Sequence, residues 1–157
     1  MTSPPFLDRL RALDASQLSH GPPGRPEKLA ELEQLIGRPL PDDFRTSVLA
    51  LGIWTVKGPR FAIGVEMIDD ILSIMRDPDW RTDLPDMALI GSDGGDCWYY
   101  YDPLDKLGHG AFAVYMVDRG VMTFARSMYI AKTLADATEC VLAGEMLYDR
   151  PYLSADS

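Results

Sequence analysis

Apolar residues recur three or four positions apart in two neighbouring stretches of the chain, which is the spacing of a helix with one buried face. The first stretch opens with Pro26, which suits a first helical position, and closes at Gly37, a typical helix stop. The second runs from Pro41 to Gly52 and has acidic residues in its first turn. Both stretches are predicted to be helices, with buried faces that hold Leu29, Leu32, Leu35, Ile36, Phe44, Val48 and Leu51.

Three further segments show helical spacing. Residues 4–14 carry apolar side chains on one side, and residues 68–75 do so until an Asp-Pro pair interrupts the pattern. Thr133 with Asp136 resembles a capping box, so a last helix is predicted to begin there and to run to about Tyr148. The apolar faces of these helices are predicted to hold Phe6, Leu7, Leu10, Leu13, Ile68, Ile71, Leu72, Met75, Leu134, Ala137, Val141 and Leu142.

Between the helices the pattern changes to short runs typical of strands. Two runs flank Gly58-Pro59 and two flank Arg119-Gly120, and each pair predicts a hairpin. The predicted strands cover residues 53–57, 60–66, 87–91, 97–102, 111–118 and 121–126. This order of elements predicts an α+β fold: a mostly antiparallel sheet with an N-terminal helical pair, one inserted helix and a C-terminal helix packed on it.

The chain of 157 residues is long enough for one domain with a proper core. Residues 15–26 are polar and rich in proline and glycine, which is typical of a linker. We therefore expect an N-terminal helix and linker in residues 1–25, the domain itself in residues 26–148, and a C-terminal tail in residues 149–157.

The sequence indicates a cytoplasmic protein. Residues 1–10 lack the basic start and apolar run of a signal peptide, and no apolar run approaches the roughly 20 residues that span a bilayer. Cys97 and Cys140 are too few for a disulfide framework and are expected to remain thiols. We expect no contact with a membrane.

The negative charge of the chain is concentrated in residues 66–105. This block holds eleven acidic residues against two arginines, which accounts for the whole net charge of −9. Concentrated acid attracts a basic partner and speeds encounter, and it argues against direct contact with nucleic acid, which needs clustered Lys and Arg. A solvated acidic face that confers only solubility explains the same charge, and charge alone favours that interpretation.

No residue pattern points to catalysis, a metal or a cofactor. His20 and His109 lie in predicted loops, the two cysteines are far apart in sequence, and there is no phosphate-binding or dinucleotide motif. The acidic turn at 93–96 could line a partner or cation site, although turn formation alone explains its Asp and Gly residues. We therefore expect no catalytic residue, no metal and no cofactor.

The strand predicted at 97–102 is unusually aromatic. Trp98 and Tyr100 share one face of it, and Tyr99 and Tyr101 share the other. One face is expected to pack against helices. The other face could then offer two rigid aromatic anchors to a partner, which are residues that protein interfaces favour.

Several segments in order match a known family. Residues 27–33 (EKLAELE), 36–44 (IGRPLPDDF), 89–96 (LIGSDGGD) and 131–136 (AKTLAD) resemble, in turn, its first helix, a helix–helix step, a turn before an aromatic strand, and the entry to its last helix. The family is the SUKH superfamily, the domain of fungal cell-wall-synthesis regulators and of many bacterial immunity proteins. The resemblance covers about residues 26–147.

The resemblance implies a non-catalytic binding module, most simply an immunity protein that binds and neutralises a bacterial toxin such as a basic nuclease. A regulatory or scaffold module with an endogenous protein partner is the alternative, and a small-ligand-binding protein or enzyme is less favoured. Whether the protein is a monomer or a homodimer stays open. The predicted partner-binding residues are Asp79, Trp80, Asp83, Asp93, Asp96, Trp98, Tyr100, Asp102 and Asp105.

Overall fold

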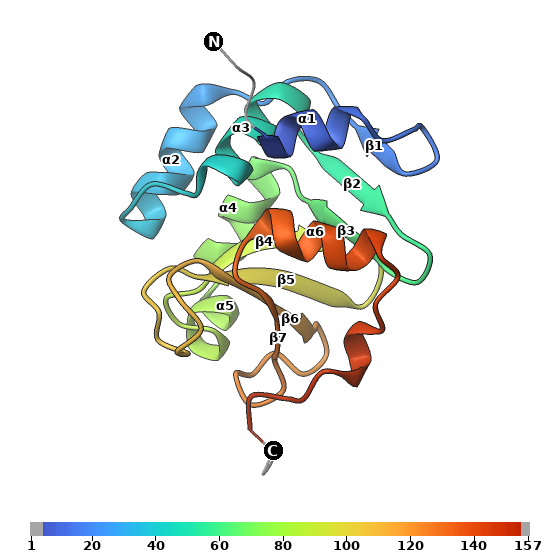
Figure 1. The fold of residues 1–157 in the computed structure, drawn as a ribbon. Coiled ribbons are helices and arrows are strands. Elements are labelled where there is room, and N and C mark those ends of the chain that lie inside the picture. Colours follow the sequence, from blue (N-terminus) through green and yellow to red (C-terminus); the bar gives the residue numbers. More distant parts are fainter. Residues whose placement is uncertain (1–4, 155–157) are drawn as a thin grey trace.

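Two antiparallel sheets form the centre of the protein in the computed structural model, which describes residues 5–154 (Figure 1). The three-stranded sheet has the order β1-β2-β3, formed by β1 (Leu18–His20), β2 (Trp54–Lys57) and β3 (Ala62–Val65). The four-stranded sheet has the order β4-β5-β6-β7, formed by β4 (Ala88–Ser92), β5 (Cys97–Asp102), β6 (Ala113–Asp118) and β7 (Met128–Ala131). The α+β fold is therefore confirmed, with two sheets in place of the single sheet expected.

The two sheets meet where β3 lies beside β4. The Glu66 amide donates to the Ile90 carbonyl at 3.1 Å. Gly91 lies so close to Gly64 that a Cβ added to Gly91 would come within 1.8 Å of the Gly64 carbonyl oxygen. A glycine at this point therefore allows the two backbones to approach, and the core runs from one sheet to the other.

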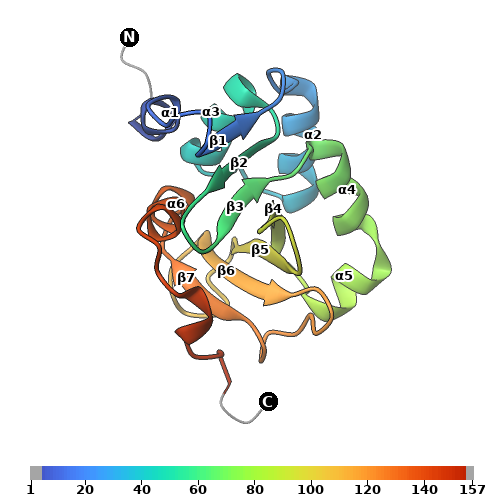
Figure 2. The same ribbon diagram turned by 90° about the vertical axis from the view of Figure 1, so that its right-hand side faces the viewer.

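Helices cover both faces of the strands (Figure 2). In Figure 2, α6 lies on one side, whereas α4 and α5 lie on the other with α2 beside α4. The helices of the described residues are α1 (Pro5–Arg11), α2 (Pro26–Ile36), α3 (Asp42–Leu51), α4 (Ile68–Arg76), α5 (Pro78–Asp83) and α6 (Leu134–Leu142), with a short 3-10 helix η1 (Leu147–Asp149).

The helix boundaries follow the local signals in the sequence. Gly37 adopts a left-handed conformation (φ 88°) after α2, and its amide donates to the Glu33 carbonyl. Thr133 caps α6 by accepting a hydrogen bond from the Asp136 amide at 3.0 Å. The α6 helix ends at Leu142, however, so its predicted extension to Tyr148 was wrong; Gly144 (φ 74°) and η1 occupy that stretch.

The segment expected as a linker contains part of the fold. Residues 18–20 form β1, which pairs antiparallel with β2. Upstream of it, α1 places Phe6, Leu7 and Leu10 in the core. The interval 15–26 therefore carries a strand that its polar composition does not reveal, and residues 5–20 belong to the same packed body as the rest.

Three other expectations changed. The second strand of the predicted hairpin is not at 121–126 but at Met128–Ala131, after a turn in which Ser127 bonds back to Thr123 and Phe124. The single inserted helix is two helices, α4 and α5. Of the expected tail, Leu153 donates its amide to Ser127, whereas residues 155–157, like residues 1–4 of the first segment, lie outside the described residues.

Both faces of β5 are covered, so the expected pair of outward aromatic anchors was wrong. The Tyr99 hydroxyl donates to the Ala62 carbonyl at 2.9 Å, and Tyr101 packs edge-on against Phe44 of α3. On the other face Tyr100 stacks on Tyr115 and meets Trp80 of α5 edge-on. Helices on both sides make this antiparallel sheet almost wholly interior, and Trp98 is the aromatic residue of β5 that keeps solvent contact.

Candidate functional site

Three of the nine predicted partner-binding residues lie in the interior and cannot contact a partner in this conformation. Trp80 is 3% exposed in a groove lined by residues of α2, α4, α5 and the β5–β6 loop, and its indole N–H donates to the Met87 carbonyl at 3.2 Å. The Tyr100 hydroxyl donates to the Ser127 hydroxyl at 2.7 Å. These contacts make Trp80 and Tyr100 core residues, and their assignment as partner-binding residues is corrected.

Asp102 is the third buried residue, and its role is to hold a loop. Its carboxylate accepts the backbone N–H groups of Lys106 at 3.0 Å and Leu107 at 2.8 Å. Its carbonyl accepts the Phe112 amide at 2.7 Å. A buried carboxylate is stabilised by such bonds, so Asp102 closes the β5–β6 connection and is not a contact residue.

Asp79, Asp83 and Asp105 are exposed, but they lie apart from the remaining candidates. Asp79 and Asp83 belong to the short helix α5. Asp105 has a left-handed backbone (φ 55°) and accepts the Gly110 amide at 2.9 Å within the β5–β6 loop. None of the three lines the hollow that surrounds Trp98.

The remaining candidates gather at one end of β5, around a half-buried Trp98. The guanidinium carbon of Arg119, which follows β6, lies 3.7 Å from the centroid of the Trp98 ring. Both side chains line a shallow hollow of about 240 Å³, shared with α4. We define the Trp98 surface as Glu66, Asp70, Asp96, Trp98 and Arg119; Asp93 and Asp118 lie at the same end of the sheet but on the face of Cys97.

The turn between β4 and β5 supplies two carboxylates at this end of the sheet, Asp96 beside Arg119 and Asp93 on the Cys97 face. Asp93 accepts the amides of Gly95 at 2.9 Å and Cys97 at 3.1 Å, so its side chain forms the turn, as the simpler of the two sequence interpretations proposed. Asp96 is exposed, and its carbonyl accepts the Arg119 amide at 2.8 Å. This backbone bond fixes the end of β6 beside the turn and brings Arg119 to Trp98.

Other elements supply the remaining carboxylates. Asp118 lies opposite Cys97 in the β5–β6 register, so its side chain lies on the Cys97 face of the sheet and not on the Trp98 face. Glu66 accepts the Ser92 hydroxyl at 3.1 Å, and Asp70 lines the hollow from α4. Asp93, Asp96 and Trp98 were predicted as contacts from the sequence, whereas Glu66, Asp70, Asp118 and Arg119 come from segments that only the fold brings together.

The Trp98 surface carries uncompensated negative charge. Within residues 5–154 none of its three carboxylates, Glu66, Asp70 and Asp96, forms an ion pair with Lys or Arg, and Arg119 is its one cation. Burial raises the pKa of the Cys97 thiol, and the carboxylates of Asp93, Asp118 and Asp96 raise it further despite a contact with the Tyr148 hydroxyl. The negative field at this end of β5 therefore reaches a neighbouring thiol.

The acidic area has a boundary at Asp93. On the side away from Trp98, a second hollow is lined by Lys57, Arg60 and Tyr148 together with Asp93. The pKa of Tyr148 is raised to about 12, first by its contact with the Cys97 thiol and then by burial. The charge changes sign across this turn, so a basic partner surface would fit on the Trp98 side.

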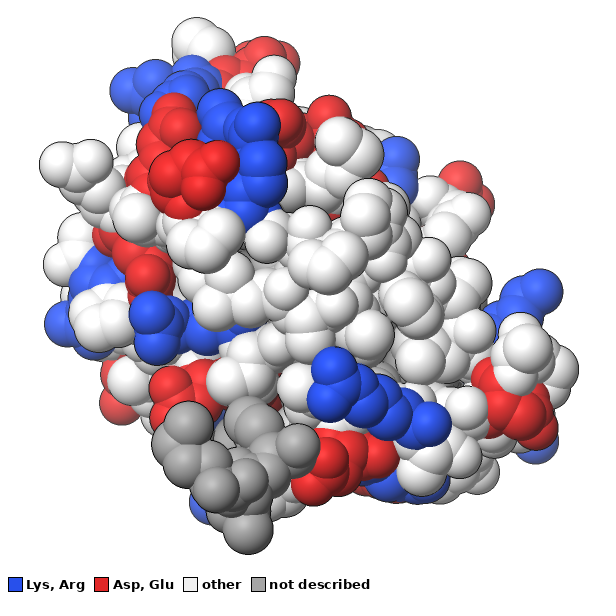
Figure 3. All heavy atoms as spheres, turned by 90° about the horizontal axis from the view of Figure 1, so that it is seen from above, with Lys and Arg blue, Asp and Glu red and all other residues white. Residues whose placement is uncertain are grey.

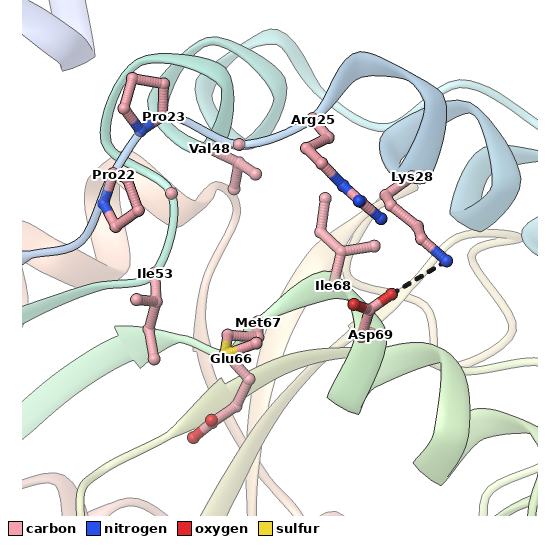
Figure 4. Close-up of a pocket in the computed structure, with 12 residues that line it drawn as sticks. Pro22, Pro23, Arg25, Lys28, Val48, Ile53, Glu66, Met67, Ile68 and Asp69 are labelled. Atoms are coloured by element: carbon pink, nitrogen blue, oxygen red, sulfur yellow. Dashed lines mark ion pairs between the residues drawn. The ribbon is translucent and has the colours of Figure 1, made fainter.

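A further hollow was not predicted from the sequence (Figure 4). It has a volume of about 180 Å³ and lies between the Pro22–Arg25 segment, the end of α3 and the start of α4. Pro22, Pro23, Val48, Ile53, Met67 and Ile68 form its apolar part, and charged residues stand at its edge. Its residues come from three separate parts of the chain, so the adjacent prolines were the one local signal.

The upper face of the molecule differs from the Trp98 surface in charge. Viewed from above, Lys or Arg and Asp or Glu side chains lie next to one another around the margin, and a broad uncharged area occupies the middle of this face (Figure 3). Ion pairs such as Arg76 with Glu31 at 2.9 Å and Lys28 with Asp69 at 3.1 Å involve α2. Paired charges of opposite sign do not select a basic partner.

Residues 5–154 contain no group of three or more His, Cys, Asp or Glu side chains arranged to hold a metal ion. Among the same residues no helix combines the length and hydropathy needed to cross a membrane. No protein-family model matches the chain, and a search of curated proteins finds no relative. The resemblance to the SUKH superfamily therefore stays a prediction.

Proposed function

We propose that this chain is a non-catalytic protein-binding module that engages a basic protein partner through the Trp98 surface. One observation carries the proposal: the Arg119 guanidinium lies on the Trp98 ring in a hollow that Glu66 and Asp70 also line, yet it forms no ion pair with a carboxylate of residues 5–154. An aromatic ring with surrounding carboxylates accepts a guanidinium or ammonium from a partner by the same chemistry.

Electrostatics sets the expected kinetics. Clustered carboxylates around a shallow hollow raise the local concentration of a basic partner and increase its association rate. Salt screens charges that are more than about 8–10 Å apart at physiological ionic strength. Association with the partner is therefore fast at low salt and slows as salt is added.

The resemblance to immunity proteins gives the proposal its biological form. The partner is then a toxin domain, and a nuclease fits because its active site must be basic to hold phosphate. Binding would cover that active site without any chemistry by this chain. The protein would act in the cytoplasm, where Cys97 and Cys140, both free thiols in the structure, would stay reduced.

The test uses two carboxylates that the fold does not need. The side chains of Asp70 and Asp96 accept no hydrogen bond within residues 5–154, unlike that of Asp93, so Asp70→Lys/Asp96→Lys leaves the turn intact. The partner is first identified by capture on the immobilised protein from its native host. Association and dissociation rates with that partner are then measured at low and physiological salt.

We expect the double variant to slow association roughly tenfold or more at low salt, with a smaller effect at physiological salt. The matched control is Asp79→Lys/Asp83→Lys, which changes the net charge equally but lies on α5 outside the Trp98 surface. Equal association rates for both double variants at both salt concentrations would contradict the proposal.

The immunity form has its own readout. Co-expression of the captured partner with this protein should relieve growth arrest in a bacterial host, and Asp70→Lys/Asp96→Lys should reduce that relief. If the captured partner is harmless when expressed alone, it is not a toxin. The regulatory alternative, which uses the same surface, then remains.

A further inference from the structure

The hollow of Figure 4, called here the Pro22 hollow, lies beside the Trp98 surface and is open to solvent. We infer that it receives one aliphatic side chain of the same basic protein partner, so that the partner's surface combines Lys or Arg with a protruding Leu, Ile or Met. This inference rests on the proposed function, because it specifies the partner of the Trp98 surface.

The walls of the hollow are apolar and partly uncovered. Met67 is 49% exposed and Ile53 is 38% exposed, so both lose solvent contact only when another molecule covers them. Pro22 and Pro23 form the opposite wall, as Figure 4 shows. Proline side chains lose no rotamer entropy on burial, so such a wall is preorganised for binding.

The rim of the hollow is charged, with opposite signs on opposite sides. Arg25 and Lys28 stand at the start of α2, and Glu66 and Asp69 stand at the start of α4. Lys28 and Asp69 form an ion pair at 3.1 Å across the gap between the two helices. An apolar centre inside a polar rim is the arrangement of a binding hot spot in protein interfaces.

The Pro22 hollow and the Trp98 surface are continuous. Glu66 lines both hollows, and Asp69 of the first hollow is the chain neighbour of Asp70 of the second. A protein surface that covers the Trp98 surface therefore reaches the Pro22 hollow over the start of α4. The rim that faces this junction is acidic, which places the partner's basic residues next to its aliphatic one.

The size of the hollow favours a side chain over a free small molecule. Its volume of about 180 Å³ is below the range of about 300–1,000 Å³ of small-molecule pockets. A single aliphatic side chain attached to a partner needs no pocket of that size, because the rest of the partner supplies the remaining contact area. The occupant is therefore a residue of the protein partner itself.

Met67→Asn separates binding from stability. Met67 is the N-cap of α4 and makes no capping hydrogen bond with its side chain, whereas Asn is among the best N-cap residues. The variant removes an apolar wall, keeps the net charge and should not lower Tm. The matched control is Leu104→Asn, because Leu104 is 48% exposed and lines neither the Pro22 hollow nor the Trp98 hollow.

The probes are two lysine-rich peptides that differ only in one central residue, Leu or Ala, titrated by calorimetry at low salt. We expect the Leu peptide to bind the parent protein roughly fivefold tighter than the Ala peptide, since more apolar surface is buried. The preference should disappear in Met67→Asn and persist in Leu104→Asn. Asp70→Lys/Asp96→Lys should weaken both peptides alike.

Each result has one meaning. Equal binding of the two peptides to the parent protein, with both weakened by Asp70→Lys/Asp96→Lys, contradicts the inference that the Pro22 hollow receives an aliphatic side chain. The proposed function is unaffected by that result. A preference for the Leu peptide that persists in Met67→Asn also contradicts this inference. Failure of both peptides to bind at low salt overturns the proposed function and the inference with it.

Discussion

Gly91 of β4 lies directly against Gly64 of β3, with no room for a side chain between them: a Cβ on Gly91 would meet the Gly64 carbonyl oxygen at 1.8 Å and the Glu66 amide nitrogen at 2.9 Å. Both neighbouring atoms belong to the backbone, so a rotamer change cannot relieve the clash. The contact joins the two sheets and sets the distance between them.

Gly91→Ala should therefore destabilise the protein by at least about 3 kcal/mol, because two paired backbones must separate to admit one methyl group. Urea unfolding followed by circular dichroism measures the loss. Gly95→Ala is the control, since the nearest atom there is an Asp93 carboxylate oxygen at 3.6 Å and the change should cost about 0.5 kcal/mol or less. Similar midpoints for the two variants would show that the sheets can separate freely.

Trp98 is the tryptophan of the described residues that keeps solvent contact, since Trp54 and Trp80 are buried. Removing the Arg119 guanidinium that covers its ring should make its fluorescence more sensitive to acrylamide. Arg119→Ala is therefore expected to raise the quenching constant and to cost about 0.5–1 kcal/mol of stability. Arg126→Ala is the control, because Arg126 lies over Tyr152. Unchanged quenching in Arg119→Ala would show that Arg119 does not shield Trp98 in solution.

The pH dependence at high pH follows from four buried tyrosines. Burial raises the pKa of Tyr99, Tyr100, Tyr101 and Tyr115 well above the ordinary value. Below about pH 10 the tyrosines are protonated in both folded and unfolded chains, so stability is unaffected. Above it the unfolded chain loses protons that the folded chain keeps, and the free energy of unfolding falls by about 1.4 kcal/mol per pH unit for each such tyrosine.

The measurement is an alkaline titration that records tyrosinate absorbance and circular dichroism together. Both signals should change in one cooperative step above about pH 10. Gradual ionisation of all the tyrosines while the circular dichroism stays constant would refute the prediction.

The cap of α6 gives a smaller, local prediction. Thr133→Ala removes the acceptor of the Asp136 amide and should cost about 1 kcal/mol, within a range of about 0.5–2 kcal/mol. Lys132→Ala changes the exposed neighbour and should leave the urea midpoint nearly unchanged. A Thr133→Ala midpoint equal to that of Lys132→Ala would mean that the start of α6 is held by other contacts, such as the Asp43 carboxylate that accepts the Ala135 amide.

Local signals were the part of the fold that the sequence predicted well. Gly37 ends α2 and Thr133 begins α6 as expected, because a left-handed glycine and a capping hydroxyl act on atoms within a few residues of themselves. The hairpin of β2 and β3 was found in the same way. The boundaries of these elements depend on nearby residues, so they can be predicted without knowledge of the rest of the chain.

The wrong predictions concern residues whose structure depends on contacts with residues distant in sequence. Strand β1 has only three residues, and its hydrogen bonds come from β2, more than thirty positions away, so polar composition suggested a linker. Alternation along β5 showed that its aromatic residues divide between two faces, but not that helices cover both. Tyr100 and Trp80 were therefore assigned to a surface although they meet edge-on in the core.

The candidate site was predicted in part for the same reason. Asp93, Asp96 and Trp98 are close in sequence, so their grouping could be anticipated. Arg119, Asp70 and the Pro22 hollow join them only through the register of β5 with β6 and the packing of α4. Charge counted along the chain pointed to residues 66–105, whereas the carboxylates without an ion pair could be located only in three dimensions.

The first helix and strand limit how the protein can be shortened for experiments. The Phe6 ring packs edge-on against Trp54 with 5.8 Å between the ring centroids, and Arg9 forms an ion pair with Glu139 of α6 at 2.7 Å. A fragment that starts at residue 26 would leave a bare indole and an unpaired strand edge facing water, and both promote aggregation. Expression for binding work or crystallisation should therefore retain residues 5–25, even though their composition suggests that they could be removed.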